Sequence, residues 1–157
     1  MKCGVASSPV VSDLRTHVGF WLRFVSNHVS QAFSRKLQKS GVTVAEWVVM
    51  REMFDDRSTS PGAVAERIGM TRGGVSKLID RLVGKELVTR TERTDDRRFQ
   101  SIALTAVGRR LVPKLAARAD ENDEEFFGPL SAGERAALLV SMKKLVQAHG
   151  LETLPTE

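Results

Sequence analysis

Apolar residues recur every three or four positions along the N-terminal part of the chain. The stripe comprises Val11, Leu14, Val18, Trp21, Val25, Val29, Phe33 and Leu37. Its period predicts one amphipathic helix over residues 12–40, which ends at Gly41. At 1.5 Å per residue such a helix spans roughly 43 Å, which exceeds the width of a small domain. We therefore expect a second copy of the chain to cover one end of it.

Two shorter helices are predicted next to each other in the middle of the chain. Ser60 is an N-cap followed by proline at the first helical position, and the helix Pro61–Ile68 stops at Gly69. Thr71 caps the next helix, which runs to about Lys85. A helix, a tight glycine turn and a second helix together predict a helix-turn-helix.

The remaining helices follow from two capping boxes and a long periodic segment. Thr43-Val44-Ala45-Glu46 opens a helix that ends near Phe54, and Ser131-Ala132-Gly133-Glu134 opens the last helix. Between them we expect a long helix over Ala106–Phe127, with a kink or a later start at Pro113. The apolar side of the last helix carries Leu138, Val140, Met142, Leu145 and Val146.

A two-stranded ribbon is predicted between the helix-turn-helix and the long helix. Residues 88–92 and 99–104 are rich in Val, Ile, Thr and Phe with polar residues interleaved, a pattern typical of paired strands. The tip Asp95-Asp96-Arg97-Arg98 carries only charged side chains. The pattern thus predicts a mainly α fold with one small β-wing.

Positive charge is concentrated in this middle region. Between Thr71 and Arg110 there are ten basic and five acidic residues, a net charge of +5. The whole chain has 24 basic and 19 acidic residues, so the remainder holds 14 of each and is neutral. A neutral scaffold with one cationic helix and one cationic ribbon favours a polyanionic partner, and DNA is the first candidate.

The sequence offers little support for a membrane protein, a secreted protein, a metal site or an enzyme. No apolar run reaches the length of about 18–20 residues that a membrane helix needs, and the N-terminus lacks the pattern of a secretory signal. A single cysteine, Cys3, cannot form an internal disulfide, in agreement with a cytoplasmic location. His17 and His28 lie roughly 16 Å apart on a helix, too far to share one metal ion. We expect no cofactor, no metal and no enzymatic activity.

Four segments resemble one family of regulators closely. They are Ala63-Val64-Ala65-Glu66-Arg67-Ile68, Gly74-Val75-Ser76-Lys77-Leu78-Ile79-Asp80-Arg81-Leu82, Asp96-Arg97-Arg98 and Leu104-Thr105-Ala106-Val107-Gly108. In this order they are similar to the multiple-antibiotic-resistance regulator (MarR) family, and the resemblance covers nearly the whole chain.

The resemblance implies a fold, a partner and an activity. It implies a winged helix-turn-helix lobe over residues 43–105 and dimerisation helices over residues 12–40 and 106–150, in one unit of residues 1–157. It implies a homodimer that binds double-stranded DNA at a pseudo-palindromic operator and regulates transcription as a repressor. Many members are released by small aromatic or phenolic effectors.

Two positions depart from the family pattern. Gly73-Gly74 stands where many members have Ser, Pro or Thr, so base reading by side chains is expected to start later in this helix. Glu86 stands where the family usually has glycine before the wing, so this helix cannot end in a left-handed glycine cap.

The helix from Thr71 is the candidate reader of the major groove. Arg and Lys donate to guanine and Ser bonds several bases, whereas bare backbone near the cap allows close approach to phosphate. The alternative is a solvated helix face. The expected contacts are Thr71, Arg72, Gly73, Gly74, Ser76, Lys77 and Arg81.

The ribbon is the candidate reader of the minor groove. Guanidinium groups are attracted into a narrow minor groove, and the family resemblance assigns this role to Arg98, oriented by Asp96, with Arg97 beside it. The alternative is a turn that is polar because it is exposed. Phosphate contacts are expected from Ser60, Arg90 and Arg93.

Two further hypotheses concern regulation. Trp21, Phe24, Trp47 and Met50 could line an aromatic effector pocket, or could equally be core residues. Cys3 invites a thiol-based redox switch, although an incidental N-terminal thiol is the simpler interpretation. A third alternative is a winged helix that binds an acidic protein instead of DNA.

Overall fold

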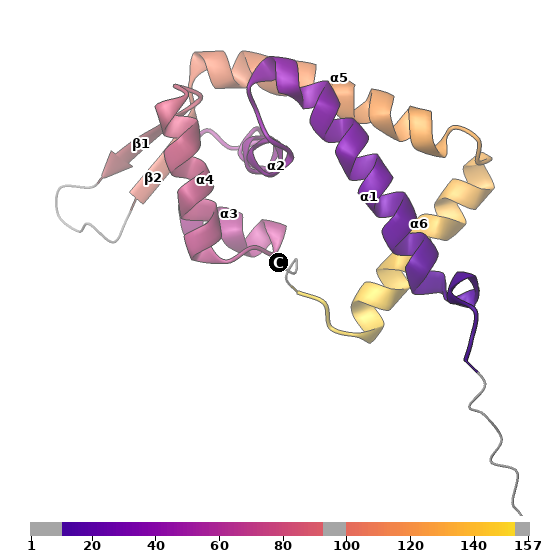
Figure 1. Cartoon of the computed structure of the whole chain (residues 1–157). Coiled ribbons are helices and arrows are strands. Elements are labelled where there is room, and N and C mark those ends of the chain that lie inside the picture. Colours follow the sequence, from indigo (N-terminus) through magenta and orange to yellow (C-terminus); the bar gives the residue numbers. More distant parts are fainter. Residues whose placement is uncertain (1–10, 93–99, 153–157) are drawn as a thin grey trace, which may run out of the picture.

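The protein folds into a lobe and two helical arms that are joined by one long helix (Figure 1). The computed structural model describes residues 11–92 and 100–152. We call the elements from α2 to β2 the lobe, and α1 and α6 the arms; α5 connects them. The elements are α1 (Val18–Leu37), α2 (Val44–Glu52), α3 (Pro61–Ile68), α4 (Arg72–Gly84), β1 (Val88–Glu92), β2 (Gln100–Leu104), α5 (Ala106–Phe127) and α6 (Ala132–Ala148).

The predicted caps are present at the helix starts. The Thr43 and Ser131 hydroxyls each accept a hydrogen bond from the backbone N–H of a glutamate three residues on, and both capping boxes are complete. Ser60 and Thr71 cap α3 and α4 in the same way. Gly69 ends α3 in the left-handed region with a φ of 64°, so the predicted helix-turn-helix is confirmed.

The first helix is shorter than its apolar stripe predicts. His17 has an extended backbone, which separates a 3-10 turn over Leu14–Thr16 from α1. A second 3-10 turn follows over Gln38–Ser40 and ends at Gly41, whose φ is 66°. The prediction of one continuous helix over 12–40 was wrong. The apolar spacing continues past His17, whereas the helical backbone is interrupted there. The 20 residues of α1 span about 30 Å.

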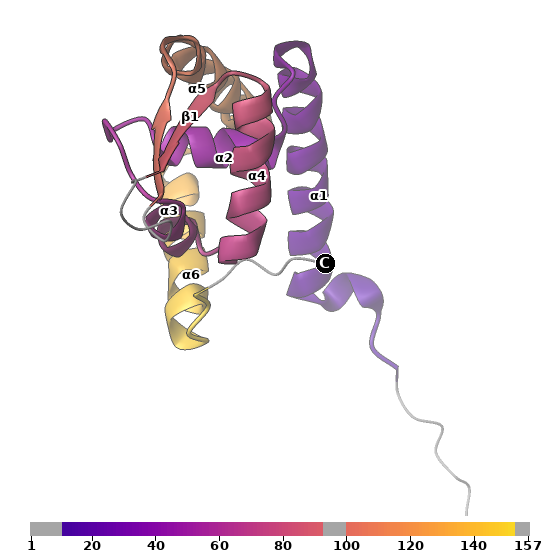
Figure 2. The same ribbon diagram turned by 90° about the vertical axis from the view of Figure 1, so that its left-hand side faces the viewer.

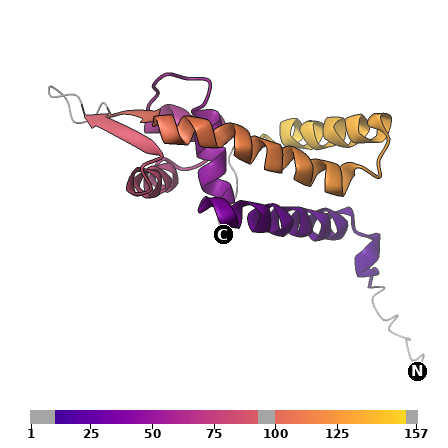
Figure 3. The ribbon, with the colours of Figure 1, turned by 90° about the horizontal axis from the view of Figure 1, so that it is seen from above.

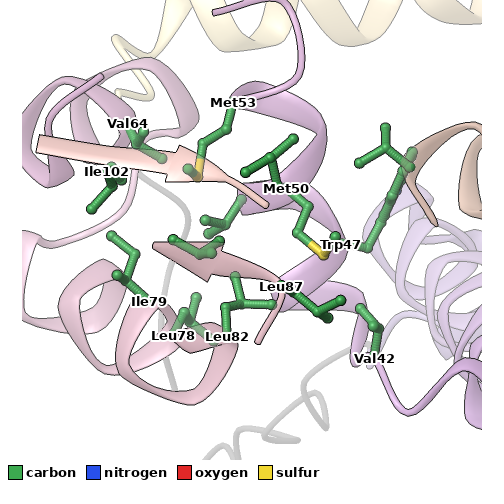
Figure 4. Close-up of a cluster of buried hydrophobic side chains, with 14 of the residues drawn as sticks. Val42, Trp47, Met50, Met53, Val64, Leu78, Ile79, Leu82, Leu87 and Ile102 are labelled. Atoms are coloured by element: carbon green, nitrogen blue, oxygen red, sulfur yellow. The ribbon is translucent and has the colours of Figure 1, made fainter. Parts of the chain in front are cut away.

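The core lies inside the lobe (Figure 4). Its centre is formed by side chains that are at most 1% exposed, among them Met50, Ile79, Leu82 and Ile102. They come from α2, α4 and β2, and the cluster also includes Val112 and Leu115 of α5 and Leu37 at the end of α1. The wing strands pair antiparallel, with Val88 opposite Leu104 and Glu92 opposite Gln100.

The arms bury little of their apolar surface. No residue of α6 is buried, and α1 buries only Ala32 and Leu37. Seen from above, α1 and α5 run side by side (Figure 3). Their contact includes the buried Asn122 of α5, whose side-chain amide donates to the backbone carbonyl of Val29 at 3.3 Å and accepts from Lys36.

The helix α5 starts where predicted and fits tightly against the lobe. It runs over Ala106–Phe127 as predicted and contains Pro113, so the alternative of a later start is excluded. Thr105 caps it, and Gly108 lies so close to the lobe that a Cβ there would overlap the carbonyl oxygen of Leu87. Among the described helices, none is both long enough and apolar enough to cross a membrane.

Candidate nucleic-acid interface

Helix α4 has one buried face and one free face. Val75, Leu78, Ile79 and Leu82 are buried in the lobe core. On the opposite side Gly73, Lys77 and Arg81 follow one another at helical spacing, and all three are exposed. Figure 2 shows α4 on the outer side of the lobe, with the wing strands beside it.

The N-terminal turn of α4 presents backbone rather than side chains. The Thr71 hydroxyl accepts the Gly74 N–H at 3.1 Å. The Arg72 guanidinium lies toward α3, where a Cβ on Gly62 would be 3.8 Å from its Nε. Ser76 is half-buried at the edge of the free face. The side chains predicted to contact bases therefore do not all lie on one face of α4, because the Arg72 guanidinium lies over the start of α3 whereas Lys77 is on the free face.

The C-terminal end of α4 is held by a buried carboxylate. Lys85 donates to both carboxylate oxygens of Glu46, at 2.8 and 2.7 Å, and to the carbonyl of Gly41 at 2.7 Å. Burial of Glu46 acts to raise its pKa, but hydrogen bonds from Lys85 and the Thr43 backbone outweigh it, so the pKa lies below the usual value. The charged pair fixes the end of α4 relative to α2.

The turn from α4 into the wing uses a left-handed residue that is not glycine. Glu86 has a φ of 59°, although an L-residue is unfavourable there. Its neighbour Leu87 donates to the carbonyl of Leu82 at 3.0 Å, and the Thr105 hydroxyl donates to the carbonyl of Glu86 at 2.8 Å. The chain thus keeps the left-handed turn although it lacks the glycine that would favour it.

Arg90 differs from its expected role as a phosphate contact. Its guanidinium donates to Asp80 of α4 at 2.6 Å, and its side chain is only 26% exposed. Among the described residues, the buried Nε atom of Arg90 has no hydrogen-bond partner. Arg90 therefore ties the wing to α4 instead of lying free on the surface.

The base of the wing is joined to the segment that precedes α3. Thr59 and Ile102 exchange two backbone hydrogen bonds of 2.9 and 2.8 Å, which form an isolated β-bridge at the edge of the ribbon. Arg109 of α5 donates to the carbonyls of Phe54 and Asp56 in the same segment, at 2.8 and 2.9 Å. The Ser60 hydroxyl accepts from the Ala63 N–H at 3.2 Å, so its side chain serves as a helix cap.

Sequence reasoning missed the residues that hold this surface together. Asp80, Lys85 and Arg109 each bind a group that is at least ten residues away in sequence. The one available signal was Asp80, an acidic residue on a helix face that is otherwise cationic. Five further predicted residues (Cys3, Arg93, Asp96, Arg97 and Arg98) lie outside the described residues.

The four candidate effector residues do not form one pocket. Trp47 and Met50 belong to the lobe core, at 8% and 0% exposure. Phe24 is exposed on α1, where its ring stacks on His28 at 4.5 Å. Trp21 instead lines an open apolar groove of about 620 Å³ between the arms, with Val18, Val25, Phe127, Leu138 and Met142.

Comparison with known proteins supports the same interpretation of the fold. Residues 40–98 match the model of the MarR family, and these residues contain the whole helix-turn-helix. Over this region the chain is similar to the MarR family. It is 24% identical over 136 residues to the transcriptional repressor NicR of Pseudomonas putida, covering 87% of this chain and 86% of NicR.

Solved structures of the MarR fold superpose on most of the chain. A structure concerning regulation of DNA binding of Bordetella bronchiseptica BpsR by 6-hydroxynicotinic acid has a TM-score of 0.77 at 26% identity, covering 87% of this chain and 97% of BpsR. A mutant MarR from E. coli with operator DNA has a TM-score of 0.76 at 22% identity, covering 86% and 99%. The chain is thus similar to DNA-binding regulators of transcription.

Proposed function

We propose that the protein is a homodimeric repressor that reads a pseudo-palindromic operator with α4 in the major groove and the wing in the minor groove. The proposal rests on the free face of α4, where Lys77 and Arg81 are exposed, whereas the opposite face of the helix is buried in the core. Lys77 and Ser76 are the proposed base contacts. Arg98 with Asp96, Arg97 and Arg93 would act from the wing, and no catalytic activity is proposed.

The arms support the dimer. Val18, Trp21 and Leu145 are between 48% and 79% exposed, and they belong to an apolar surface that runs over both helices. A second copy of the same surface would cover it, as expected for a two-fold interface. The proposed dimer then places two α4 helices about one turn of DNA apart, ~34–36 Å.

Selection of bound duplexes from a random pool tests this proposal. We expect a palindrome whose half-sites are one helical turn apart.

Lys77→Ala should change the base preference as well as the affinity, whereas a uniform loss on all sequences would make Lys77 a phosphate contact. Arg98→Ala should weaken binding at least about tenfold, the effect of one good contact. Unchanged affinity would remove the wing from the proposal.

Salt dependence and oxidation distinguish the two alternatives. Binding to DNA should weaken steeply as salt rises, because counterions are released from the phosphates. A winged helix that serves an acidic protein would select no duplex from the pool. For the redox alternative, a Cys3→Ser variant that keeps any response of DNA binding to peroxide would exclude the thiol as a sensor.

A small aromatic effector is the remaining part of the proposal. BpsR, a relative of similar fold, has its DNA binding regulated by 6-hydroxynicotinic acid. Trp21 and Phe24 remain candidates on the arms, whereas Trp47 and Met50 contribute to the core. A panel of hydroxylated aromatic acids, added to the protein–DNA complex, should release the DNA if an effector of this class exists. The cytoplasm remains the proposed location, since a transcriptional regulator works where the DNA is.

A further inference from the structure

The first turn of α4 contains two consecutive glycines, Gly73 and Gly74, which are unfavourable helix residues. The structure gives a packing reason for only one of them. A Cβ on Gly74 would lie 3.0 Å from the Thr71 hydroxyl that caps the helix. A Cβ on Gly73 would meet nothing within 4 Å, and its φ is not in the left-handed region. The fold therefore has no need of glycine at position 73.

The neighbouring side chains leave this turn bare on its outer side. The Thr71 hydroxyl is engaged in the cap, and the Arg72 guanidinium lies over the first turn of α3. Val75 is fully buried. The first α4 side chains after Arg72 that reach the free face are those of Ser76 and Lys77, one turn further on.

Gly73 nevertheless lies on the face proposed to meet DNA. Residues 73, 77 and 84 follow one another along one exposed side of α4, since four and eleven residues are close to one and three full turns. The N-terminal part of a recognition helix is the part that approaches the base edges. At this end the protein thus presents main chain without a side chain.

We propose that Gly73 is a specificity-determining residue that acts through its missing side chain. The bare first turn lies against the operator at van der Waals distance, so the helix sits deep in the groove and sequence is read from Ser76 onward. This inference rests on the proposed DNA-binding function. It also explains why a residue that weakens the helix occupies a position with open space around it, because glycine permits an approach that alanine would block.

The substitution Gly73→Ala tests the proposal, with Gly84→Ala as its matched control. Gly84 lies in the same helix and on the same face, three turns away, and an added Cβ there also meets nothing within 4 Å. Both variants should raise Tm by about 2 °C, because alanine favours the helix. Only Gly73→Ala should weaken binding of the duplex selected by the wild type, by about tenfold or more, the effect of a mismatched base pair.

Each other result identifies what failed. If Gly73→Ala binds as tightly as the wild type, the bare turn does not lie against DNA and the inference is overturned. An equal loss in Gly84→Ala would assign the effect to a stiffer helix, which also overturns it. If the full-length wild type selects no duplex from the random pool, the DNA-binding proposal itself is wrong and this inference falls with it.

Discussion

Apolar side chains are buried in the lobe but largely exposed in the arms. In the lobe, Met50 and Leu82 are completely buried among side chains of their own chain. In the arms, Leu145 is 50% exposed and Val18 is 79% exposed, although both lie in regular helix. The difference teaches that the lobe is stabilised within one chain, whereas the arms require an additional surface.

The free energy of folding therefore has two parts, one from the lobe and one from the arms. Burial of apolar area contributes roughly 25 cal/mol per Å², so the lobe core stabilises the chain at any protein concentration. The arms gain a comparable contribution only when a second surface covers them, and association makes that part depend on concentration. Variants in the two regions should therefore differ in kind as well as in size.

The largest expected effect is in the lobe, from Gly108→Ala. The new Cβ would overlap the Leu87 carbonyl, so either α5 or the wing must move. We expect a loss of about 3 kcal/mol in the free energy of unfolding, measured by urea denaturation. The matched control is Gly133→Ala in the arm α6, where an added Cβ meets nothing within 4 Å. Equal stability of the two variants would contradict the tight fit of α5.

Leu145→Ala should weaken the arms without affecting the lobe. Removal of an exposed apolar side chain from the proposed interface should lower dimer affinity by about tenfold, or about 1.4 kcal/mol. Sedimentation equilibrium measures the affinity, and the circular dichroism spectrum reports whether the fold is intact. An unchanged dissociation constant would place the dimer interface elsewhere.

Glu46→Gln should change the pH dependence of stability. Because the folded pKa of Glu46 is lower than its unfolded value of about 4.3, its contribution is fully present above that value and is lost as pH falls through the folded pKa. At pH 7 the variant should lose about 1–3 kcal/mol, the value of a hydrogen bond to a charged group. The difference from wild type should shrink under acidic conditions. A difference that stays constant down to pH 2 would show that the carboxylate charge is not what matters.

The smallest effect is expected from Glu86→Gly. Glycine adopts a positive φ without steric cost, so the variant should be more stable than wild type by about 1 kcal/mol. Thermal unfolding measures it, and Glu66→Gly in the interior of α3 is the opposite control, since there glycine should destabilise. If Glu86→Gly also destabilises, the Glu86 side chain makes a compensating contact.

Sequence reasoning succeeded where the cause of a structure is local. Thr43, Ser60 and Ser131 each bond to backbone within three residues, so a short motif contains all the information. It failed at His17, where the apolar period continues through a break in the helix. The period also cannot distinguish apolar residues that face the core from those that face a partner. Trp47 and Trp21 both follow helical spacing, but only Trp47 is buried.

The exposed residues of the interface were predictable from the sequence, whereas the contacts between its helices and strands were not. Lys77 and Arg81 are exposed on α4 as the pattern of apolar neighbours predicts. The pairing of Arg90 with Asp80 depends on how the ribbon folds back over the helix, and no periodicity contains that information. The same holds for Glu46, whose capping role was evident but whose contact with Lys85 spans 39 residues of sequence.

The contact of Lys85 with Gly41 has a consequence for exchanging parts between relatives. Lys85 and its carboxylate partner Glu46 both belong to the lobe, whereas Gly41 closes the segment that leads from the arm. The acceptor on the arm side is a backbone carbonyl, which every residue possesses. A chimera that replaces α1 thus keeps the Lys85 contact as long as the backbone turn at residue 41 is preserved. Because Asn122 joins α5 to α1, the side chains that contact it on α1 must be kept as well.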